Sequence, residues 1–497
     1  MASSVLKVEG IVKSFGGVQA LKGVHLEIGN GEIHCLAGEN GSGKSTLIKV
    51  ISGVHEPDQG SIEIEGRRFA RLNPMEAIGL GVQVIYQDFS VFPNMSVMEN
   101  LALNMELMDK RRFMNYRRAR SIASEAVSQI GFDVDLDERV ENLSVADRQL
   151  IAIGRALLQD SKLIIMDEPT SALTKKEVKA LFAVIKSLQA RGISILFVSH
   201  KLDEVFEISE RYTILRNGEN VAAGSTAGLE RKAFAFHMTG REFADESYRP
   251  RAAPGKPILS VKGLSLRGRY SGISFDLAPG EILGITGLLG SGRTELVETL
   301  FGIVRPDSGS IEIDGKAVTI KNVKSAIGKG VGYVPSDRLT EGLFLPQTIE
   351  RNAVVGVLDR LSDRFGFLRR KAIAETMRKW ISELSIATKD PSLPVRTLSG
   401  GNQQKVVLAR WLASDLRVLI LNGPTMGVDI GAKYDIHALI RRLAAEGLAV
   451  IIVSDDMPEV LACASRIFVM REGAIVQELD PAATTEASLG ELSTGVA

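Results

Sequence analysis

Short apolar runs that end at a polar residue recur along the chain, and they predict buried strands. In the first half such runs cover residues 33–37, 162–167 and 194–199. Continuous apolar segments of this length are typical of strands that are covered on both faces, as in a parallel sheet. Because stretches with a helical period separate these runs, the pattern predicts an α/β fold built on a parallel sheet.

Amphipathic helices are predicted between the strands. Residues 115–130 place apolar side chains on one helical face, and Gly131 follows as a stop signal. The apolar positions of this face are Ala119, Ile122, Ala123, Ala126, Val127 and Ile130. The matching stripe in the second half consists of Ile373, Met377, Trp380, Ile381 and Leu384. We therefore expect helical insertions around 95–155 and 345–410, with both stripes facing the core.

One domain-sized unit occurs twice in the chain. The segments that carry the repeat are GEIHCLAGENGSGKSTL (from Gly31) with GEILGITGLLGSGRTEL (from Gly280), and GSIEIEG (from Gly60) with GSIEIDG (from Gly309). The period of about 250 residues excludes a solenoid of short repeats. The stretch 241–256 is polar, contains two prolines and lacks apolar periodicity, as a linker does. We therefore predict two domains of similar fold, residues 1–245 and 256–497.

The composition is that of a globular protein without a charge surplus. Of the 497 residues, 45% are hydrophobic, and 60 Lys and Arg balance 60 Asp and Glu. A generic nucleic-acid binder would carry a basic surplus, so this class is disfavoured. No apolar run approaches the roughly 20 residues of a membrane-spanning helix, and the first residues lack a signal-peptide core. We expect a cytoplasmic protein that is not itself a channel, with Cys35 and Cys463 as buried free thiols.

Residues 38–45 read GENGSGKS and match the P-loop pattern G-x-x-x-x-G-K-[ST] between a predicted strand and a predicted helix. Glycines let backbone N–H groups close around a phosphate, and the helix N-terminus adds positive potential. Lys44 has the reach to contact the β- and γ-phosphates, and the Ser45 hydroxyl is a ligand for Mg²⁺. The alternative, a glycine-rich turn without a ligand, leaves the strand–loop–helix context unexplained. The candidate nucleotide-binding residues are Gly38, Glu39, Asn40, Gly41, Ser42, Gly43, Lys44, Ser45 and Thr46.

An acidic pair follows the second apolar run. Asp167 and Glu168 come directly after KLIIM, so both emerge at the carboxyl edge of the predicted sheet, where ligands bind in open α/β folds. Asp167 suits Mg²⁺, directly or through water. Glu168 suits the role of general base for an attacking water. The alternative is a salt-bridged pair on the surface.

Further residues complete an ordered set. Phe15 lies in KSFGGVQAL, Gln87 follows VQVIY, and His200 ends ILFVSH. Together with the P-loop and the acidic pair, this set resembles the ATP-binding cassette (ABC) ATPases. Two cassettes in one chain, with GLLGSGRTEL and LSGGNQQKVVLARWL in the second, look like the ATPase subunit of sugar-uptake ABC transporters of the ribose/galactose/xylose type. The resemblance implies that Phe15 stacks on adenine, that Gln87 senses the γ-phosphate, its metal and the permease, and that His200 contacts the γ-phosphate. A lone Phe or His in an apolar context is otherwise a core residue.

By the same resemblance, cassettes pair head to tail, and each ATP lies between the P-loop of one cassette and the signature segment of the other. For the first P-loop the opposite wall is LSGGN, in which Ser399, Gly400 and Gly401 face the phosphates. Asp429, in PTMGVD, supplies the carboxylate that is expected after the acidic strand. We expect ATP and Mg²⁺ as the cofactors of this site.

The other composite site lacks the side chains that hydrolysis needs. Its replacements are Arg293 for Lys44, Ser336 for Gln87, Asn422 and Gly423 for the acidic pair, Asp455 for His200 and Thr174 for Asp429, and its signature reads Ser144, Val145, Ala146 and Asp147. Loss of a positioned general base alone costs about 10²–10⁴ in rate. We predict one hydrolytic site per chain, which the second half completes; whether the second site binds nucleotide stays open.

The resemblance also implies partners. An importer motor would sit at the cytoplasmic face of the inner membrane, bound to a pair of integral permease subunits and served indirectly by an external sugar-binding protein. Apolar residues after Gln87 are candidates either for contact with the permease or for local core packing, namely Phe89, Val91, Phe92 and Met95. The alternatives are a soluble tandem-cassette ATPase that acts on ribosomes or nucleic acid, and a non-hydrolytic scaffold. The short linker of mixed charge disfavours the first alternative, and the intact first P-loop site disfavours the second.

Overall fold

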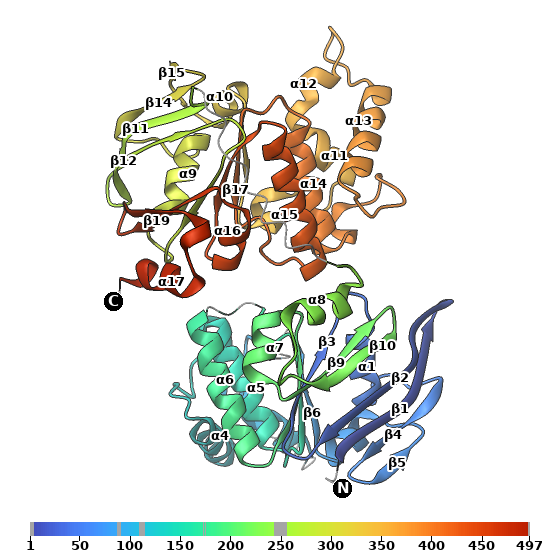
Figure 1. The fold of residues 1–497 in the computed structure, drawn as a ribbon. Coiled ribbons are helices and arrows are strands. Elements are labelled where there is room, and N and C mark those ends of the chain that lie inside the picture. Colours follow the sequence, from blue (N-terminus) through green and yellow to red (C-terminus); the bar gives the residue numbers. More distant parts are fainter. Residues whose placement is uncertain are drawn as a thin grey trace. The chain divides into compact units, whose positions relative to one another are not determined.

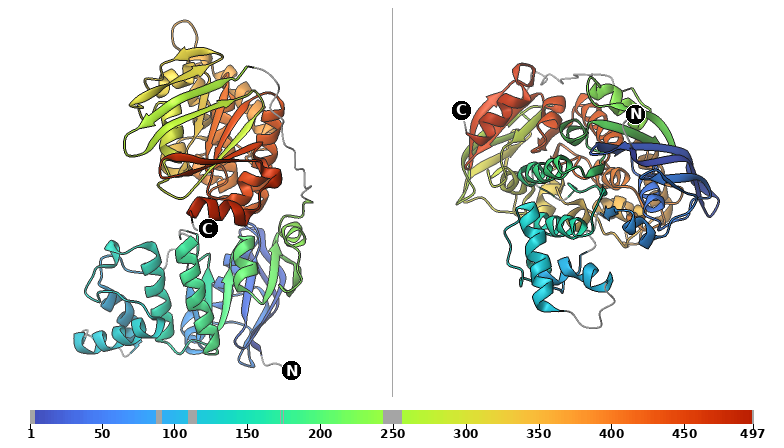
Figure 2. Two further views of the ribbon diagram at one scale, coloured as in Figure 1. Left: turned by 60° about the vertical axis from the view of Figure 1, so that its left-hand side comes forward. Right: turned by 90° about the horizontal axis from the view of Figure 1, so that it is seen from below.

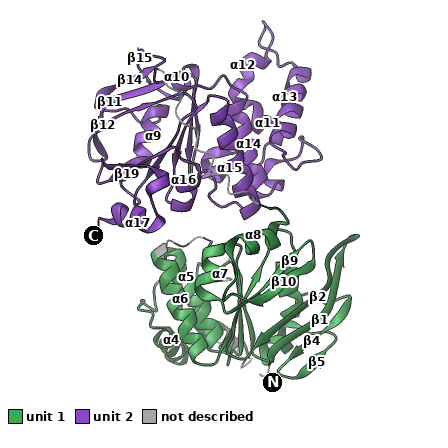
Figure 3. Cartoon of the chain, viewed as in Figure 1, with its two compact units in different colours: residues 1–243 green, residues 244–497 purple. Residues whose placement is uncertain are grey.

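The computed structural model describes residues 4–86, 91–108, 115–171, 173, 175–242 and 256–495. The chain divides into two compact units, residues 1–243 and 244–497 (Figure 3). Both units have the α/β architecture expected from the sequence, with similar elements in similar order (Figure 1). The predicted linker falls almost wholly in 243–255, outside the described residues.

The central sheet of unit 1 has six strands in the order β10-β9-β3-β8-β7-β6. Its strands are β3 (Ile33–Ala37), β6 (Val82–Ile85), β7 (Leu163–Asp167), β8 (Ser194–Val198), β9 (Arg211–Arg216) and β10 (Glu219–Ser225). All neighbouring pairs are parallel except β9 with β10. Both β3 and β8 are buried along their whole length, which confirms the prediction from their apolar runs.

A second, antiparallel sheet with the order β2-β1-β4-β5 accompanies the first, and the sequence did not predict it. Its strands are β1 (Ser4–Phe15), β2 (Val18–Gly29), β4 (Gln59–Ile64) and β5 (Arg67–Phe69). Side chains of β1, β2 and β4 form one buried cluster with those of helix α1 (Lys44–Ile51). This cluster fixes α1 between the two sheets. It thereby also positions the loop 38–43, which directly precedes α1.

The helices of unit 1 include the predicted insertion. They are α2 (Pro74–Gly79), α3 (Val97–Met108), α4 (Tyr116–Ile130), α5 (Val145–Leu157), α6 (Lys175–Ala190), α7 (Leu202–Ile208) and α8 (Arg231–Thr239). Helices α3, α4 and α5 pack on one another, apart from the antiparallel sheet of the unit (Figures 1 and 2). Gly131 ends α4 with φ 65°, as the sequence pattern predicts, and the Asn115 side chain caps the start of the helix.

Unit 2 repeats both sheets, in the orders β12-β11-β14-β15 and β16-β17-β18-β13-β19-β20. The strands are β11 (Leu259–Leu266), β12 (Tyr270–Leu277), β13 (Ile282–Thr286), β14 (Ser308–Ile313), β15 (Lys316–Val318), β16 (Val331–Val334), β17 (Val418–Asn422), β18 (Ala449–Val453), β19 (Arg466–Arg471) and β20 (Ala474–Leu479). The α-helices are α9 (Arg293–Phe301), α10 (Val323–Gly328), α11 (Ile349–Val354), α12 (Leu358–Leu361), α13 (Arg370–Glu383), α14 (Gly400–Leu412), α15 (Ile430–Ala445), α16 (Met457–Cys463) and α17 (Glu486–Thr494).

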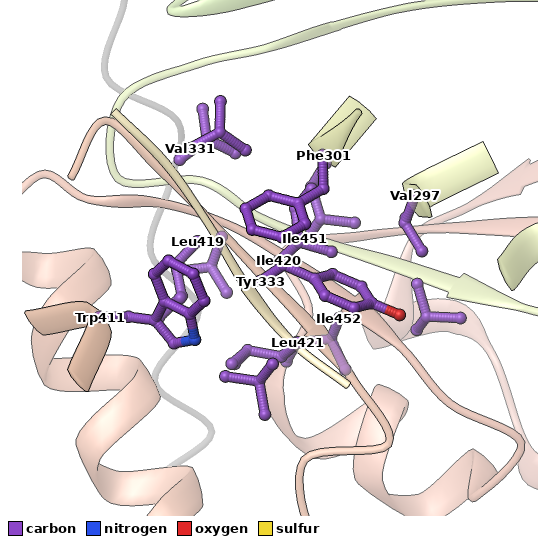
Figure 4. Packing of buried hydrophobic residues seen from close by; sticks show 14 of the residues in the cluster. Val297, Phe301, Val331, Tyr333, Trp411, Leu419, Ile420, Leu421, Ile451 and Ile452 are labelled. Carbon is purple, nitrogen blue, oxygen red and sulfur yellow. The ribbon is translucent and has the colours of Figure 1, made fainter. Parts of the chain in front are cut away.

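Aromatic rings distinguish the core of unit 2. Phe301 stacks on Tyr333 with ring centroids 5.2 Å apart, and its edge-to-face contact with Trp411 spans 5.4 Å. Figure 4 shows these rings among the aliphatic side chains of β17 and β18. Across the described part of the whole chain, no helix combines the length and the apolarity that crossing a membrane requires.

Candidate nucleotide-binding site

The loop between β3 and α1 in unit 1 depends on its glycines. Gly38 and Gly43 have φ values of 150° and 108°. A Cβ atom on Gly38 would lie 2.3 Å from the Leu215 carbonyl oxygen, and one on Gly43 would lie 2.8 Å from that of Ala20. Neither position tolerates a side chain, so the loop is built to expose backbone to a ligand. It contains the candidates Gly38, Glu39, Asn40, Gly41, Ser42 and Gly43, and Lys44, Ser45 and Thr46 form the first turn of α1.

Lys44 is buried inside this loop. Its Nζ donates to the carbonyl oxygens of Gly38 (2.7 Å) and Glu39 (3.0 Å). Burial lowers the pKa of Lys44, while the charges of Glu168 and Asp167 act in the opposite direction. The Ser42 hydroxyl is buried and has no hydrogen-bond partner within the described residues. A cradle of glycines with a buried cation and an unpartnered hydroxyl fits a phosphate group.

The acidic pair lies where the sequence predicts. Asp167 is the last residue of β7, and the Ser45 side chain hydrogen-bonds to it. Burial and the neighbouring Glu168 raise the pKa of Asp167, so its charge is poorly compensated. A divalent cation held by the Ser45 hydroxyl and the Asp167 carboxylate would supply that compensation, and hard oxygen ligands of this kind suit Mg²⁺.

Glu168 has a backbone conformation that side-chain-bearing residues rarely adopt. Its φ is 48°, and its N–H donates to the Val198 carbonyl at 3.1 Å. His200 Nδ1 lies 3.0 Å from Glu168 Oε1. Burial disfavours the charged form of Glu168, but the His200 hydrogen bond and nearby positive charges outweigh it and lower the pKa of Glu168. The carboxylate is therefore ionised and oriented, as a general base must be.

Phe15 ends β1 and is 42% exposed. Its ring lies 5.1 Å from that of His55 and 5.5 Å from Lys13 Nζ, and the rest of the side chain is exposed to solvent. In unit 2 this ring is absent. Ser14 N donates to Asp58 and Arg267 N donates in the same way to Asp307, which aligns Phe15 with Gly268. The sequence comparison missed this loss because the corresponding strand of unit 2 is shorter, 8 residues against 12.

The corresponding loop of unit 2 keeps its shape and changes its chemistry. Gly287 and Gly292 have φ values of 155° and 91°, close to those of unit 1. Arg293 is buried, and its Nη1 donates to the Gly287 carbonyl at 2.6 Å. Burial lowers the pKa of Arg293, and the charge of Asp455 partly offsets this effect. A carboxylate thus lies near this loop where unit 1 has His200.

In unit 2, neutral residues occupy the two positions that correspond to the acidic pair of unit 1. Asn422 ends β17, and its Nδ2 donates to the Tyr333 hydroxyl at 3.2 Å. Burial raises the pKa of Tyr333 to about 12, so its hydroxyl stays protonated. Gly423 follows with φ 60° and donates its N–H to the Val453 carbonyl at 2.8 Å. Neither an anionic metal ligand nor a carboxylate base is present at these two positions.

The signature segments of the two units differ in how their serine is held. Ser399 precedes α14, and its Oγ accepts a hydrogen bond from Asn402 Nδ2 at 2.9 Å. A Cβ atom on Gly401 would lie 2.3 Å from Ala432 Cβ, so this glycine is needed for packing as well. In unit 1, by contrast, the Ser144 hydroxyl donates to the Asp147 carboxylate at 2.7 Å. A phosphate at Ser144 would meet a negative charge.

Arg338 is a residue that the sequence analysis missed. It follows β16 and reaches the loop before α15, where Nη1 donates to the Met426 carbonyl at 2.6 Å and Nη2 to that of Gly427 at 2.8 Å. A Cβ atom on Gly400 would lie 2.7 Å from Arg338 Nη2. The Arg338 guanidinium therefore lies between the start of α14, which carries the signature segment, and the loop that leads to Asp429. No motif carries this contact, because its partners are backbone atoms.

The predicted Asp429 carboxylate caps a helix. It precedes α15, and its Oδ1 accepts the Ala432 N–H at 2.8 Å. Two other predicted positions, Gln87 and Thr174, lie outside the described residues, as does Phe89. Phe92 is 45% exposed, and Val91 and Met95 are half-buried. The structure thus brings together Lys44, Ser45, Asp167, Glu168 and His200 in unit 1, and Ser399, Gly400, Gly401 and Asp429 in unit 2.

Comparisons with known proteins identify the family of the chain. A family model described as ABC transporter matches residues 21–171 and 270–426. The ribose import ATP-binding protein RbsA of Bacillus licheniformis is 39% identical over 490 residues, which cover 99% of each chain. The ribose import ATP-binding protein RbsA 2 of Streptomyces avermitilis is 40% identical and is covered over 97% of its length. Among solved structures, a nucleotide-free ATP-binding cassette from an ABC transporter is 29% identical with a TM-score of 0.42, over 45% of this chain and 92% of its own. The chain therefore belongs to the ABC transporter family, with one matched cassette region in each unit.

Proposed function

We propose that this chain is the ATPase subunit of a sugar-uptake transporter and that ATP hydrolysis in unit 1 drives the import. The observation that carries the proposal is the pairing of a complete P-loop, Asp167, Glu168 and His200 in unit 1 with relatives that are named ribose import ATP-binding proteins. These relatives match the chain along 99% of its length. Other small sugars and sugar-like solutes belong to the same proposal, because the residues described here contact nucleotide and not cargo.

Unit 1 holds the proposed Mg²⁺–ATP. The glycine cradle and Lys44 bind the phosphates, Ser45 and Asp167 ligate the metal, and Phe15 stacks on the base. Glu168 accepts a proton from the attacking water, and His200 orients Glu168. Bound Mg²⁺ would neutralise developing charge on the phosphates. Gln87 is assigned to metal and γ-phosphate contact by family resemblance alone.

Unit 2 serves this hydrolytic site by its signature segment. In the proposal, Ser399, Gly400, Gly401 and Asp429 complete the wall around the nucleotide that the first P-loop binds. The contrast between the two signatures supports this assignment, since Ser399 keeps a neighbour without charge and Ser144 is engaged by Asp147. Asn422, Gly423 and Asp455 make the second P-loop site non-hydrolytic.

The transporter's pore comes from other chains in this proposal. Both units present an exposed phenylalanine that an asparagine holds in the same way. The Phe92 N–H donates a hydrogen bond to Asn100 Oδ1 at 2.8 Å, and Asn100 Nδ2 donates to the Phe92 carbonyl at 2.9 Å. Phe344 and Asn352 make the same two hydrogen bonds at 2.8 and 3.0 Å. A repeated apolar contact point suits a pair of integral permease subunits at the cytoplasmic face of the membrane, with an external sugar-binding protein that delivers the cargo.

Co-expression with a candidate permease tests the proposal. We expect the chain to co-purify with the permease and to hydrolyse ATP faster when the loaded binding protein is added to the reconstituted complex. A panel of sugars in a thermal-shift assay of the binding protein identifies the cargo. Robust ATPase activity together with failure to associate with any integral membrane protein would contradict the transport function.

A further inference from the structure

The connection between α12 and α13 in unit 2 forms a hairpin that projects beyond both helices (Figure 1). We call residues 359–371 the basic-aromatic hairpin. Ser362 and Leu368 form an isolated β-bridge at its base, and Asp363 N donates to the Phe367 carbonyl at 2.8 Å. The Asp363 carboxylate accepts the N–H groups of Phe365 (2.8 Å) and Phe367 (3.0 Å). The tip is therefore held in one shape by its own hydrogen bonds.

Apolar side chains at this tip point into solvent. Phe365 is 70% exposed, Phe367 is 72% exposed and Leu368 is 49% exposed. Isolated exposed apolar residues are normal on a protein surface, but three within four positions, on a convex and pre-ordered tip, mark an interaction site. Burial of these three side chains therefore requires another molecule.

Basic side chains surround the apolar tip. The Arg364 guanidinium lies 4.7 Å from the centre of the Phe365 ring, and Arg369 Nη2 donates to the Arg360 carbonyl at 2.9 Å. Arg370 and Lys371 continue the basic run into α13, whose first turn contains no acidic residue. The only acidic residues of the hairpin are Asp359 and Asp363. The net charge is clearly positive although the whole chain is neutral.

The first half carries the same composition at the matching place between α3 and α4. Residues 109–120 read DKRRFMNYRRAR, which combine basic residues with Phe113, Met114 and Tyr116. Tyr116, the first residue of α4, is 62% exposed. Both copies of the repeat therefore carry a basic and aromatic sequence at this point, which indicates a shared function.

We propose that the basic-aromatic hairpin binds the surface of an anionic lipid bilayer directly. Aromatic rings favour the boundary between headgroups and acyl chains, and arginine and lysine side chains bind lipid phosphates. A projecting tip can enter the headgroup region of a bilayer without a complementary pocket on its partner. This inference goes beyond the proposed function, because the contact needs no permease.

Vesicle binding by the purified full chain tests the proposal. Cys35 and Cys463 are both buried, so a Phe367→Cys variant accepts a fluorescent label at the hairpin alone. We expect nitroxide-labelled lipids to quench this label in vesicles of phosphatidylcholine with phosphatidylglycerol, and not in vesicles of phosphatidylcholine alone. Partition to the anionic vesicles should fall about tenfold or more in a Phe365→Ser/Phe367→Ser variant and in an Arg364→Glu/Arg370→Glu variant.

Met75→Ser is the matched control, because Met75 is 66% exposed and lies outside any basic cluster described here. This variant should partition like the parent chain, and all variants should keep the parent melting temperature and ATPase activity. Equal partition of the parent and both hairpin variants would overturn the proposal. Quenching that requires permease in the vesicles would overturn it too, since the hairpin would then bind protein. Neither result would affect the ATPase or transport assays that test the proposed function.

Discussion

Glu168 and Gly423 occupy the same backbone position in the two units. Each follows the last residue of a buried strand, each has a positive φ (48° and 60°), and each donates its N–H to the neighbouring strand, to Val198 or Val453. A residue with a side chain pays a conformational cost in this region of the backbone, whereas glycine does not. Unit 1 retains the strained glutamate, and this points to a functional reason for it.

The first prediction concerns this pair. Glu168→Gln should lower the rate of phosphate release by about 10²–10⁴-fold while ATP binding persists, because the amide cannot accept a proton from water. Gly423→Glu is the matched control. A Cβ at Gly423 would meet Met426 and Ser336 at ordinary contact distances of 3.6–3.8 Å, but its φ of 60° imposes the same backbone strain that Glu168 bears. The variant should therefore fold with a somewhat lower melting temperature, and its turnover should stay unchanged. Turnover of Glu168→Gln within twofold of the parent would contradict the assignment.

The second prediction concerns pH. Burial raises the pKa of Asp167, so the ionised carboxylate costs stability above the folded-state pKa, and this cost vanishes as the pH falls below the unfolded value. Asp167→Asn should therefore raise the melting temperature of the nucleotide-free chain at pH 7, and the gain should disappear in acid. The same variant should lose Mg²⁺-dependent hydrolysis. An equal melting shift at pH 7 and at pH 4 would show that burial of charge is not the cause.

The third prediction separates stability from catalysis in unit 2. Tyr333→Phe removes the acceptor of the buried Asn422 amide and should destabilise the chain by about 1–3 kcal/mol, the usual cost of an unsatisfied buried group. Denaturant unfolding followed by fluorescence of Trp411, which packs in the same aromatic cluster, measures the loss. ATP turnover of the folded fraction should match that of the parent. A selective fall in turnover would place Asn422 in the working site.

The fourth prediction concerns Arg338 as a positioning residue. Arg338→Lys cannot bridge the Met426 and Gly427 carbonyls together, so kcat of the assembled transporter should fall by about tenfold to a hundredfold with little change in KM for ATP. Arg410→Lys is the control, because Arg410 is buried and its guanidinium hydrogen-bonds to Asn352, away from the Met426 and Gly427 carbonyls. It should lower the melting temperature without a selective effect on kcat. Equal effects of both variants on kcat would reduce Arg338 to a structural role.

Local signals in the sequence predicted the parallel strands and the P-loop well. The strand at 33–37 and the helix that ends at Gly131 lie where the pattern predicts them. A short apolar run and a glycine stop depend only on residues that are neighbours in the sequence, so both can be recognised without the fold. The sequence did not predict the antiparallel sheet of β1, β2, β4 and β5, because its pairings join segments that are distant in the sequence, such as Leu6 and Ile64. Alternating burial in β1 is interrupted by register shifts, which weakens the strand pattern.

The sequence predicted the parts of the candidate site that consist of characteristic side chains. It did not predict contacts that side chains make with backbone atoms. Type and spacing predicted that Lys44, Asp167 and Glu168 lie close together, and the structure places them so. Arg338 was missed because it binds carbonyl oxygens 88 and 89 positions away, which no motif encodes. The match of Phe15 to Gly268 was missed because unit 2 shortens a hairpin, and a constant repeat distance then misaligns the residues before the turn.

That shortened hairpin has a consequence for nucleotide selection. With Gly268 at the place of Phe15, the second loop lacks the aromatic ring that accompanies the first, yet its glycines and Arg293 still form a phosphate cradle. Such a loop would bind the phosphate groups of a nucleotide without contacting its base through an aromatic ring. For any nucleotide bound there, we expect the identity of the base to matter less than at the first loop.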